Sequence, residues 1–469
     1  MLEIFESESY IDIFDSKKLL MIKYFILLAL IISTSIGLAQ QKDSPKLIVG
    51  IVVDQMCYEY LYRFYDKFSE GGIKKLMEDG TNCRSTQYNY IPTYTGPGHA
   101  SIYTGTTPNN HGIVANDWFD RNSNGIINCV GDSTVRTVGS ESIYGLFSPR
   151  NLKSNTITDQ LKLTYPDAKV ISMSIKNRGA ILPGGHLSDG SYWYDFQTGH
   201  FITSSFFKNE LPKWVENFNK EERVEFLLSQ DWNTYYPIET YTESGPDDSP
   251  YEHLLPGKAS PVFPYALDSM KLMTNKPELF VYTPFCDTYL TDFAIESITN
   301  EELGKDGQTD MLCISYSTPD IIGHAFGPYS KEIEDTYIRL DLDIQRLIKE
   351  LEDKVGKKDF TIFLTADHGV VPVPQRLMDD GLPGGYVFVD TNMYEIRQSL
   401  KTKFGADVIN AVENLNIYLN DDRIDSLGAS KNEIIGFIVD ELKEWNSVKR
   451  VFTADQLYNG PIDDEWMDM

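Results

Sequence analysis

Aspartates with histidines nearby are the residues of this sequence best suited to bind metal ions. Asp320 and His324 are four residues apart, a spacing that puts both side chains on one face of a helical turn. Asp367 and His368 are adjacent and precede a glycine, and Asp54 ends an apolar run. Such ligands suit zinc better than manganese or iron. The pattern therefore predicts a metal site, although any one of these aspartates alone could simply cap a helix.

Thr95 is the candidate nucleophile, in the segment PTYTGPGHAS of residues 92–101. Proline is favoured in the first turn of a helix, so we expect a helix to begin near Pro97 with Thr95 just before it. There the helix dipole and the free backbone N–H groups would favour an alkoxide, and a metal ion would lower the hydroxyl pKa further. The alternative is that Thr95 is only an N-cap. We expect structural roles for His99 and His111.

Three further polar residues could bind an anionic substrate. Asn116 could donate to a phosphoryl oxygen, and Lys176 and Arg178 follow the apolar run VISMSI. Alternate residues of an extended segment share a face, so the two cations could converge on one anion, and arginine binds phosphate through two hydrogen bonds. The alternative is a solvated basic turn.

The elements that must position these residues are buried strands and amphipathic helices. Continuous apolar runs at residues 46–54, 310–320 and 360–367 each end in an aspartate and are typical of buried parallel strands. Helical patterns lie at residues 58–79 and 331–354. Alternating strands and helices predict an α/β fold with a mostly parallel central sheet flanked by helices. Ligands of such sheets bind beyond the carboxyl ends of the strands, where the three aspartates lie.

Two segments depart from this pattern within a catalytic domain that we expect to span residues 40–469. Residues of about 180–285 are rich in Tyr, Phe, Pro and Gly, with few clear strands, and we interpret them as an insertion or cap over the sheet edge. Residues of about 390–456 read as a small α+β subdomain, with helical patterns at 392–404 and 431–445 around a strand at 417–419.

The first 39 residues resemble a targeting segment rather than part of the fold. Lys23 and the apolar run that follows it, closed by small residues before residue 40, form a secretory signal peptide that starts at Met21. We interpret the acidic residues 1–20 as an extension upstream of the true start. The run is short for a membrane span, so we expect a periplasmic or secreted protein without a stable membrane anchor.

Composition limits the partners. The formal net charge is -27, which disfavours nucleic acid and anionic membranes and requires a local cationic site for any anionic substrate. The five cysteines show no CxxC spacing, which argues against a thiolate metal site. Small-molecule phosphate esters fit a site of metal ions and fixed cations, while composition leaves the oligomeric state open.

The motifs together resemble the alkaline phosphatase superfamily, in its branch of type I phosphodiesterases and nucleotide pyrophosphatases. Within that branch the sequence is most similar to the periplasmic alkaline phosphatases with a threonine nucleophile, which hydrolyse phosphate monoesters. The resemblance covers nearly all of residues 46–375 and rests on five segments in family order: LIVGIVVDQM, PTYTGPGHASIYTGTTPNNHGIVANDWFD, SIKNRGA, STPDIIGHAFGP and LTADHGV.

The resemblance implies two zinc ions and a phosphothreonine intermediate on Thr95. It implies one zinc on Asp54, Asp367, His368 and Thr95, and a second on Asp320 and His324. It implies that the phosphoryl oxygens are bound by Asn116, Lys176 and Arg178, of which the Lys-x-Arg pair favours monoesters because a doubly charged terminal phosphate gains more from two cations.

One family feature has no counterpart. The family pattern places a third histidine of the second zinc in a Thr-His-Gly turn near the C-terminus, and no histidine follows His368. We therefore expect that the C-terminal end of the domain is missing or that this ligand has been lost. Two alternatives follow: a phosphodiesterase or nucleotide pyrophosphatase on the same fold, and an inactive, truncated binding protein.

Overall fold

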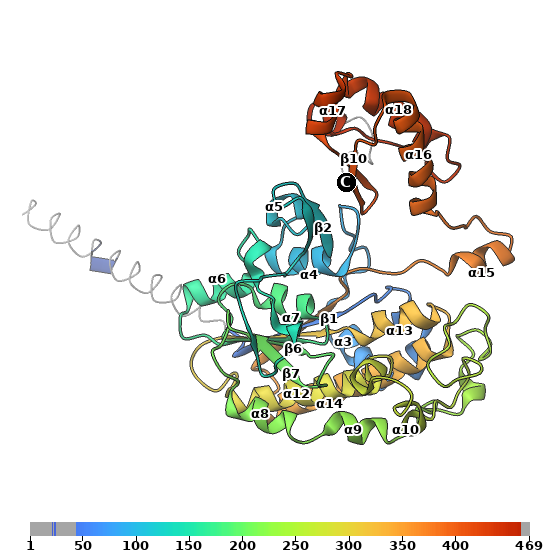
Figure 1. Ribbon diagram of the computed structural model, residues 1–469. Helices are drawn as coiled ribbons and strands as arrows, with labels where there is room; N and C mark the ends of the chain where they lie inside the picture. The colour runs from blue at the N-terminus through green and yellow to red at the C-terminus, as the bar shows by residue number, and fades with distance from the viewer. Residues whose placement is uncertain (1–20, 22, 25–43, 461–469) are drawn as a thin grey trace, which may run out of the picture. The chain divides into compact units, whose positions relative to one another are not determined.

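A seven-stranded, mostly parallel sheet organises the protein (Figure 1). The computed structural model describes residues 21, 23, 24 and 44–460, and the chain divides into a unit of residues 1–45 and a unit from residue 46 onward. The predicted signal peptide lies, apart from residues 21, 23 and 24, outside the described residues. The strand order in the second unit is β4-β7-β6-β5-β8-β1-β9. The strands are β1 (Leu47–Val53), β4 (Thr137–Val138), β5 (Val170–Ser174), β6 (Gly190–Tyr194), β7 (Phe201–Ser204), β8 (Asp310–Tyr316) and β9 (Phe360–Thr365).

The three predicted strands form the part of the sheet that matters for the site, although β8 ends at Tyr316 and the last residues of the predicted 310–320 run, Asp320 included, begin α13 (Thr318–Phe326) instead. β1 lies between β8 and β9 and pairs in parallel with both. Their starts are in register, because Leu47 is opposite both Asp310 and Phe360. The three strands therefore end at the same edge. Side chains on β1 alternate between two cores, with Val49, Ile51 and Val53 in one and Val52 in the other.

Helices cover both faces of the sheet. Residues of α4 (Thr95–Thr104) and α6 (Ile157–Thr164) pack on the face that holds Val52. Residues of α12 (Phe285–Asn300) and α14 (Lys331–Lys354) pack on the opposite face, with the larger core. Figure 1 shows these two helix layers above and below the sheet. The α/β fold class predicted from the sequence is confirmed, and α14 has the bounds that its apolar spacing indicated.

The remaining helices are mostly short. They are α2 (Tyr60–Arg63), α3 (Ile73–Asp79), α5 (Pro108–His111), α7 (Asn177–Gly184), α8 (Lys213–Asn219), α9 (Arg223–Leu228), α10 (Leu267–Met270), α11 (Lys276–Phe280), α13 (Thr318–Phe326), α15 (Pro374–Asp379), α16 (Val389–Phe404), α17 (Asp421–Leu427), α18 (Lys431–Lys443) and α19 (Ala454–Asn459). The single helix expected at residues 58–79 is instead divided into α2 and α3, because Gly71 and Gly72 precede α3 and glycine disfavours a helix interior.

Residues 180–285 contribute more to the sheet than their composition indicated. They supply β6 and β7, and β6 pairs in parallel with β5. Every residue of both strands is buried, so no alternation of polar and apolar residues marks them in the sequence. Loops and the helices α8 to α11 make up most of the rest of this segment.

Residues 389–442 pack around a core of their own. α16, α17 and α18 surround the antiparallel hairpin of β10 (Ile409–Glu413) and β11 (Asn416–Leu419), with Leu400 fully buried. The two-residue turn at Asn414 and Leu415 has positive φ at both positions, as tight hairpins require. This hairpin contacts a second hairpin, β2 (Asp117–Asp120) with β3 (Gly125–Asn128), since Asn414 Nδ2 donates to the carbonyl of Asp117 at 2.7 Å.

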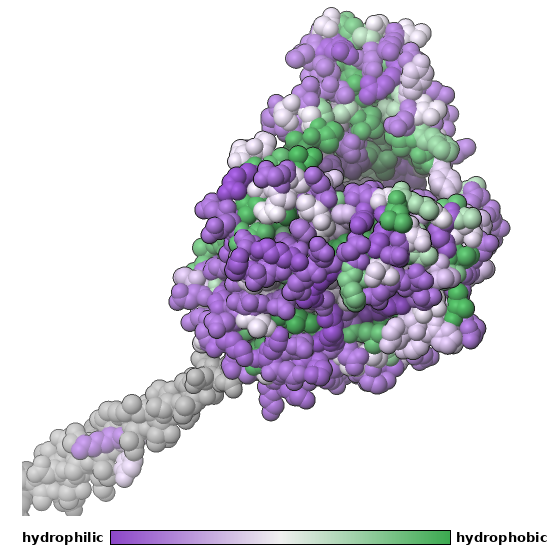
Figure 2. All heavy atoms as spheres, turned by 60° about the horizontal axis from the view of Figure 1, so that its bottom comes forward, coloured by the Kyte–Doolittle hydropathy of each residue, from purple (hydrophilic) through white to green (hydrophobic). Residues whose placement is uncertain are grey.

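The character of the surface and of the helices can be compared with the composition. Hydrophilic residues cover most of the face shown in Figure 2, in keeping with the net charge of -27. Within the part of the chain that the structure describes, no helix has both the length and the apolar character needed to cross a membrane.

Candidate functional site

The three aspartates that end apolar runs in the sequence meet at the carboxyl edge of the sheet. Asp54 directly follows β1, Asp320 lies in the first turn of α13 after β8, and Asp367 follows β9. All three side chains are buried. Three carboxylates out of water in one place need cations or hydrogen-bond donors around them.

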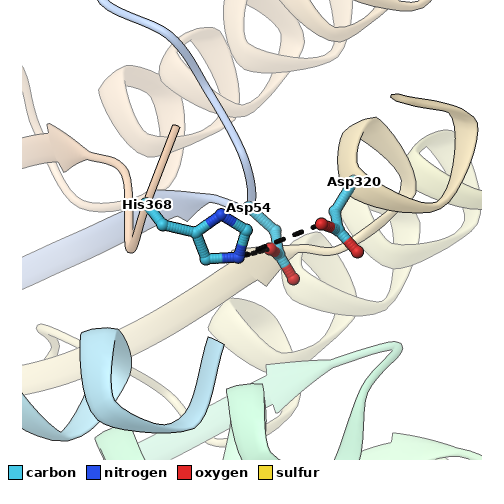
Figure 3. A group of neighbouring side chains, drawn as sticks. All are labelled: Asp54, Asp320 and His368. Carbon is cyan, nitrogen blue, oxygen red and sulfur yellow. Dashed lines mark ion pairs between the residues drawn. The ribbon is translucent and has the colours of Figure 1, made fainter. Parts of the chain in front are cut away.

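His368 is the centre of this group. Its Nε2 lies 3.3 Å from Asp54 Oδ1 and 3.9 Å from both Asp320 Oδ1 and Asp367 Oδ2. Figure 3 shows the ring pointing at Asp54 and Asp320, whose ligand atoms lie with Nε2 within 4.8 Å of one another. Nδ1 lies 2.9 Å from the carbonyl of Gly369, to which it donates. That hydrogen bond fixes the ring and leaves Nε2 directed at the carboxylates, as in histidines that bind metals.

The donor set fits a divalent cation. Asp54 Oδ1 and Asp367 Oδ2 are buried and face only imidazole nitrogens at long distances, Asp54 Oδ1 at 3.3 Å from His368 Nε2 and Asp367 Oδ2 at 3.2 Å from His99 Nδ1. A buried carboxylate oxygen is costly unless positive charge lies close to it, and a bound cation would supply more charge than these imidazoles do. Lys176 supplies positive charge at this point, because its Nζ lies 2.7 Å from Asp54 Oδ2 and also contacts Asp320 Oδ2.

The charges of the site alter its acid–base properties. Burial alone would lower the pKa of His368, but the hydrogen bond to Asp54 and the charges of Asp367 and Asp54 outweigh burial and raise that pKa to about 9. Burial favours a higher pKa for Asp367, yet the charges of His99, His368 and Lys176 lower it to about 2. The carboxylate of Asp367 is therefore ionised at neutral pH.

Thr95 is next to this group at the start of a helix. It is the first residue of α4, two positions earlier than expected, and its Oγ1 lies 3.5 Å from His368 Nε2. His99 Nδ1 donates to the carbonyl of Thr95 at 2.9 Å, and its Nε2 lies 2.7 Å from Ser315 Oγ. His99 thus ties the first turn of α4 to β8, in keeping with a structural role. The helix N-terminus favours negative charge on the hydroxyl oxygen.

Asn116 lies beside the same helix terminus. Its Oδ1 accepts a hydrogen bond of 2.7 Å from the backbone N–H of Gly96, the residue after Thr95. The amide group is thereby oriented, with its Nδ2 atom still able to donate.

The two predicted cations lie at the start of α7, where Lys176 still has extended backbone angles and Arg178 is helical rather than extended. Lys176 is the N-cap of α7 and Arg178 lies in its first turn, because the residues Gly179-Ala-Ile-Leu continue as a helix. Arg178 Nε is buried without a hydrogen-bond partner. Burial raises the pKa of Cys129 to about 12, and the charge of Arg178 opposes this rise. The Sγ atom of Cys129 lies beside Gly96, the residue after Thr95. Lys176 therefore faces the carboxylates, and the charge of Arg178 acts on both Lys176 and Cys129.

His324 is the outermost of the predicted residues. Its Nε2 lies 3.2 Å from Asp320 Oδ1, one helical turn away, and 72% of its side chain is exposed. The i, i+4 spacing therefore produces the proximity expected from the sequence. All nine sequence-predicted residues lie at or beside this sheet edge, with Arg178 placed through its neighbours and not by a direct contact.

Sequence reasoning missed the residues that hold the loops in place. Gln55 donates from Nε2 to Asp320 Oδ1 at 2.8 Å and from its backbone N–H to Asp367 Oδ1 at 3.2 Å. Val370 N–H donates to Cys57 Sγ at 3.3 Å, and Tyr88 donates to the carbonyl of Ala366 at 2.6 Å. The one sequence signal for Gln55 and Cys57 is that they follow Asp54 within three residues.

Comparison with a family model gives a match over most of the chain. Residues 48–445 match the model described as type I phosphodiesterase / nucleotide pyrophosphatase. This range includes the sheet edge and every residue of the site.

Individual relatives are similar over comparable lengths. Alkaline phosphatase PafA of Elizabethkingia meningoseptica is 40% identical over 94% of this chain and 81% of its own length. Alkaline phosphatase PhoV of Synechococcus elongatus is 46% identical over 73% of this chain and 62% of its own length. A solved structure of a PafA mutant, with one threonine changed to serine and an asparagine, a lysine and an arginine changed to alanine, has a TM-score of 0.86. It is 38% identical and covers 91% of this chain and 82% of that one.

Proposed function

Because the chain belongs to the type I phosphodiesterase/nucleotide pyrophosphatase family of the alkaline phosphatase superfamily, we propose that it hydrolyses phosphate monoesters through Thr95 at a two-zinc site. Alkaline phosphatases at 40% and 46% identity make the chain a phosphatase hydrolase. The finer assignment of residues to roles is our proposal.

One observation carries it. The hydroxyl oxygen of Thr95, at a helix N-terminus, lies 3.5 Å from His368 Nε2, which in turn lies 3.3 Å from Asp54. A nucleophile, a buried acidic cluster and cationic side chains thus share one site, as phosphoryl transfer requires.

The residues present fit zinc. Asp54, Asp367 and His368 would hold one ion beside Thr95, and Asp320 with His324 would contribute to a second. When bound, zinc lowers the pKa of hydroxyl groups and stabilises negative charge on the leaving oxygen. Carboxylate and imidazole ligands at buried positions support this choice of metal.

The chain's own residues would bind and orient the phosphoryl group. Asn116 Nδ2 and the cations of Lys176 and Arg178 would donate to its oxygens, and Arg178 Nε has no other hydrogen-bond partner. The mutant PafA structure carries changes at a threonine, an asparagine, a lysine and an arginine, the same residue types in the same order as Thr95, Asn116, Lys176 and Arg178. In both chains one residue separates the lysine from the arginine.

Thr95 would attack phosphorus in line with the leaving group. An O–P bond forms to Thr95 Oγ1 while the bond to the ester oxygen breaks, and the alcohol leaves. Water then attacks the phosphothreonine, which releases phosphate and restores the hydroxyl. Positioning and charge stabilisation supply most of the acceleration.

A diesterase or nucleotide pyrophosphatase is the second candidate, because the matching family model carries that description. Two cations near the phosphoryl site favour the monoester, since its terminal phosphate bears two charges while a diester bears one.

We also propose that the protein acts in the periplasm or outside the cell, on small-molecule phosphate esters. The signal-peptide pattern from Met21 supports this location. The net charge of -27 disfavours nucleic acid and so supports small-molecule substrates.

Turnover of para-nitrophenyl phosphate and of its bis-ester by the zinc-loaded chain tests the proposal. We expect kcat/KM for the monoester to exceed that for the diester, and Thr95→Ala to lower kcat by about 10³-fold or more. Thr104→Ala is the matched control, because its hydroxyl lies at the other end of α4 and bonds to the Ala100 carbonyl. Faster diester cleavage would favour the second candidate, and an active Thr95→Ala variant would reject the nucleophile.

A further inference from the structure

Gln55 joins the three loops of the site. We propose that Gln55 is a positioning residue that holds Asp320 and Asp367 in a fixed geometry around Asp54; this inference rests on the proposed function. The inference rests on two groups of Gln55, its side-chain amide and its backbone N–H. These groups contact Asp320 and Asp367, which are far from Gln55 in the sequence.

The two hydrogen bonds of Gln55 act on one oxygen of each carboxylate. Nε2 donates to Asp320 Oδ1 at 2.8 Å, while Asp320 Oδ2 contacts the Lys176 ammonium. The backbone N–H donates to Asp367 Oδ1 at 3.2 Å, while Asp367 Oδ2 is buried. Gln55 thus holds one oxygen of each carboxylate in place. Asp320 Oδ1 also lies 3.2 Å from His324 Nε2 and 3.9 Å from His368 Nε2, and Asp367 Oδ2 lies 3.2 Å from His99 Nδ1. Hydrogen bonds of this kind orient carboxylates that bind metals.

The surroundings of Gln55 are built for this contact. The residue is buried, and a Cβ atom on Gly323 would lie 2.1 Å from Gln55 Oε1. With a side chain at this position, the Gln55 amide would have to move away from α13. Because His324 follows Gly323 directly, the same packing sets the position of both Asp320 and His324 relative to β1.

The backbone at Gln55 supports a specific role. Its φ of 68° lies in the left-handed region, which residues with a Cβ atom seldom adopt. Glycine would suit this conformation better. The backbone conformation therefore does not explain why glutamine occupies this position. The hydrogen bond from its side-chain amide to Asp320 does, because glycine could not make it.

Two variants separate the amide from the backbone. Gln55→Met keeps the side-chain length and the left-handed strain but removes the Nε2 donor to Asp320. Gln55→Gly removes that donor and the strain, and the backbone N–H to Asp367 is present in both variants. Glu302→Gly is the matched control, because Glu302 is exposed and also has a positive φ of 52°.

The readouts are zinc affinity of the apoprotein, measured by competition with a chromophoric chelator, and the visible absorption of the cobalt-loaded chain. We expect both Gln55 variants to lose about 10- to 100-fold in affinity for the more weakly held zinc, with altered cobalt absorption. Gln55→Gly should keep the Tm of the wild-type apoprotein, and Glu302→Gly should leave metal affinity unchanged.

Wild-type zinc affinity in either Gln55 variant would overturn the positioning role, because both lack the amide donor. The proposed function fails by a different result: a zinc-loaded wild-type chain that does not hydrolyse para-nitrophenyl phosphate. The metal titration does not depend on that turnover, so the two failures are distinguishable.

Discussion

At the residue scale, the site is defined by one imidazole nitrogen with four oxygens around it. His368 Nε2 lies between 3.3 and 3.9 Å from oxygens of Thr95, Asp54, Asp320 and Asp367. Burial alone would lower the pKa of His368, but the hydrogen bond to Asp54 and the charges of Asp367 and Asp54 raise it to about 9. A divalent ion placed there would take over the compensation that the imidazolium and Lys176 provide.

A second histidine shows the opposite effect and gives a prediction of pH dependence. His111 is buried, accepts a hydrogen bond from Ile113 N–H at Nδ1, and lies 3.0 Å from Ser101 Oγ through Nε2. Burial lowers its pKa to about 4. Between about pH 6.5 and 4 the unfolded chain binds a proton that the folded chain does not, so acidification destabilises the fold by up to about 2 kcal/mol through this residue.

The check is a comparison with His111→Asn by denaturant unfolding at pH 7.5 and pH 4.5. We expect the variant to be less stable at pH 7.5 and the difference to shrink by about 1–2 kcal/mol at pH 4.5. A difference that is the same at both pH values would contradict the assignment.

At the element scale, α4 must approach the turn after β9 closely enough to bring Thr95 to His368. A Cβ atom on Gly98 would lie 2.4 Å from the carbonyl oxygen of Asp367 and 2.7 Å from its Cβ. The backbone cannot yield as a flexible side chain would. The glycine in this first helical turn therefore lets Thr95, the proposed nucleophile, lie close to Asp367 and His368, the proposed metal ligands.

Gly98→Ala should therefore impair both stability and catalysis. We expect it to cost about 1–3 kcal/mol of unfolding free energy, as overpacking does, and to lower monoester kcat/KM by more than tenfold. Gly436→Ala is the matched control, since Gly436 lies within α18 with open space around it and alanine should stabilise the helix by about 0.5–1 kcal/mol. An active and fully stable Gly98→Ala variant would show that α4 can move away without consequence.

At the scale of the whole molecule, the central sheet and residues 389–442 have separate hydrophobic cores. The catalytic sheet has its core between two helix layers, while residues 389–442 have their own. Contacts between them include Asn414 with Asp117 and the ring of Tyr418 with that of Phe119, 5.0 Å apart. Asp117 and Phe119 follow Asn116 closely, so the small unit borders the region where we propose that the phosphoryl group binds, without supplying a predicted ligand.

Leu400→Ala tests this separation. Leu400 is fully buried in the small core, so the change should cost about 2–5 kcal/mol there, seen as faster hydrogen exchange across residues 389–442. Monoester kcat should stay within about twofold of the wild type at 25 °C, because the folded population still dominates. The control is Leu457→Ala at an exposed position of α19. A parallel loss of kcat would mean that the small unit contributes to the active geometry.

The sequence by itself determined the three strands that precede Asp54, Asp320 and Asp367, the bounds of α14, and the residue types suited to metal and phosphate. Each of these follows from apolar spacing, caps or adjacency within a few residues. The tertiary structure alone decided that β6 and β7 enter the sheet, that Arg178 lies on a helix, and that Gln55 joins three loops. The partners of Gln55 are 265 and 312 residues away, and no local pattern encodes a hydrogen bond that exists only after β1, β8 and β9 pair.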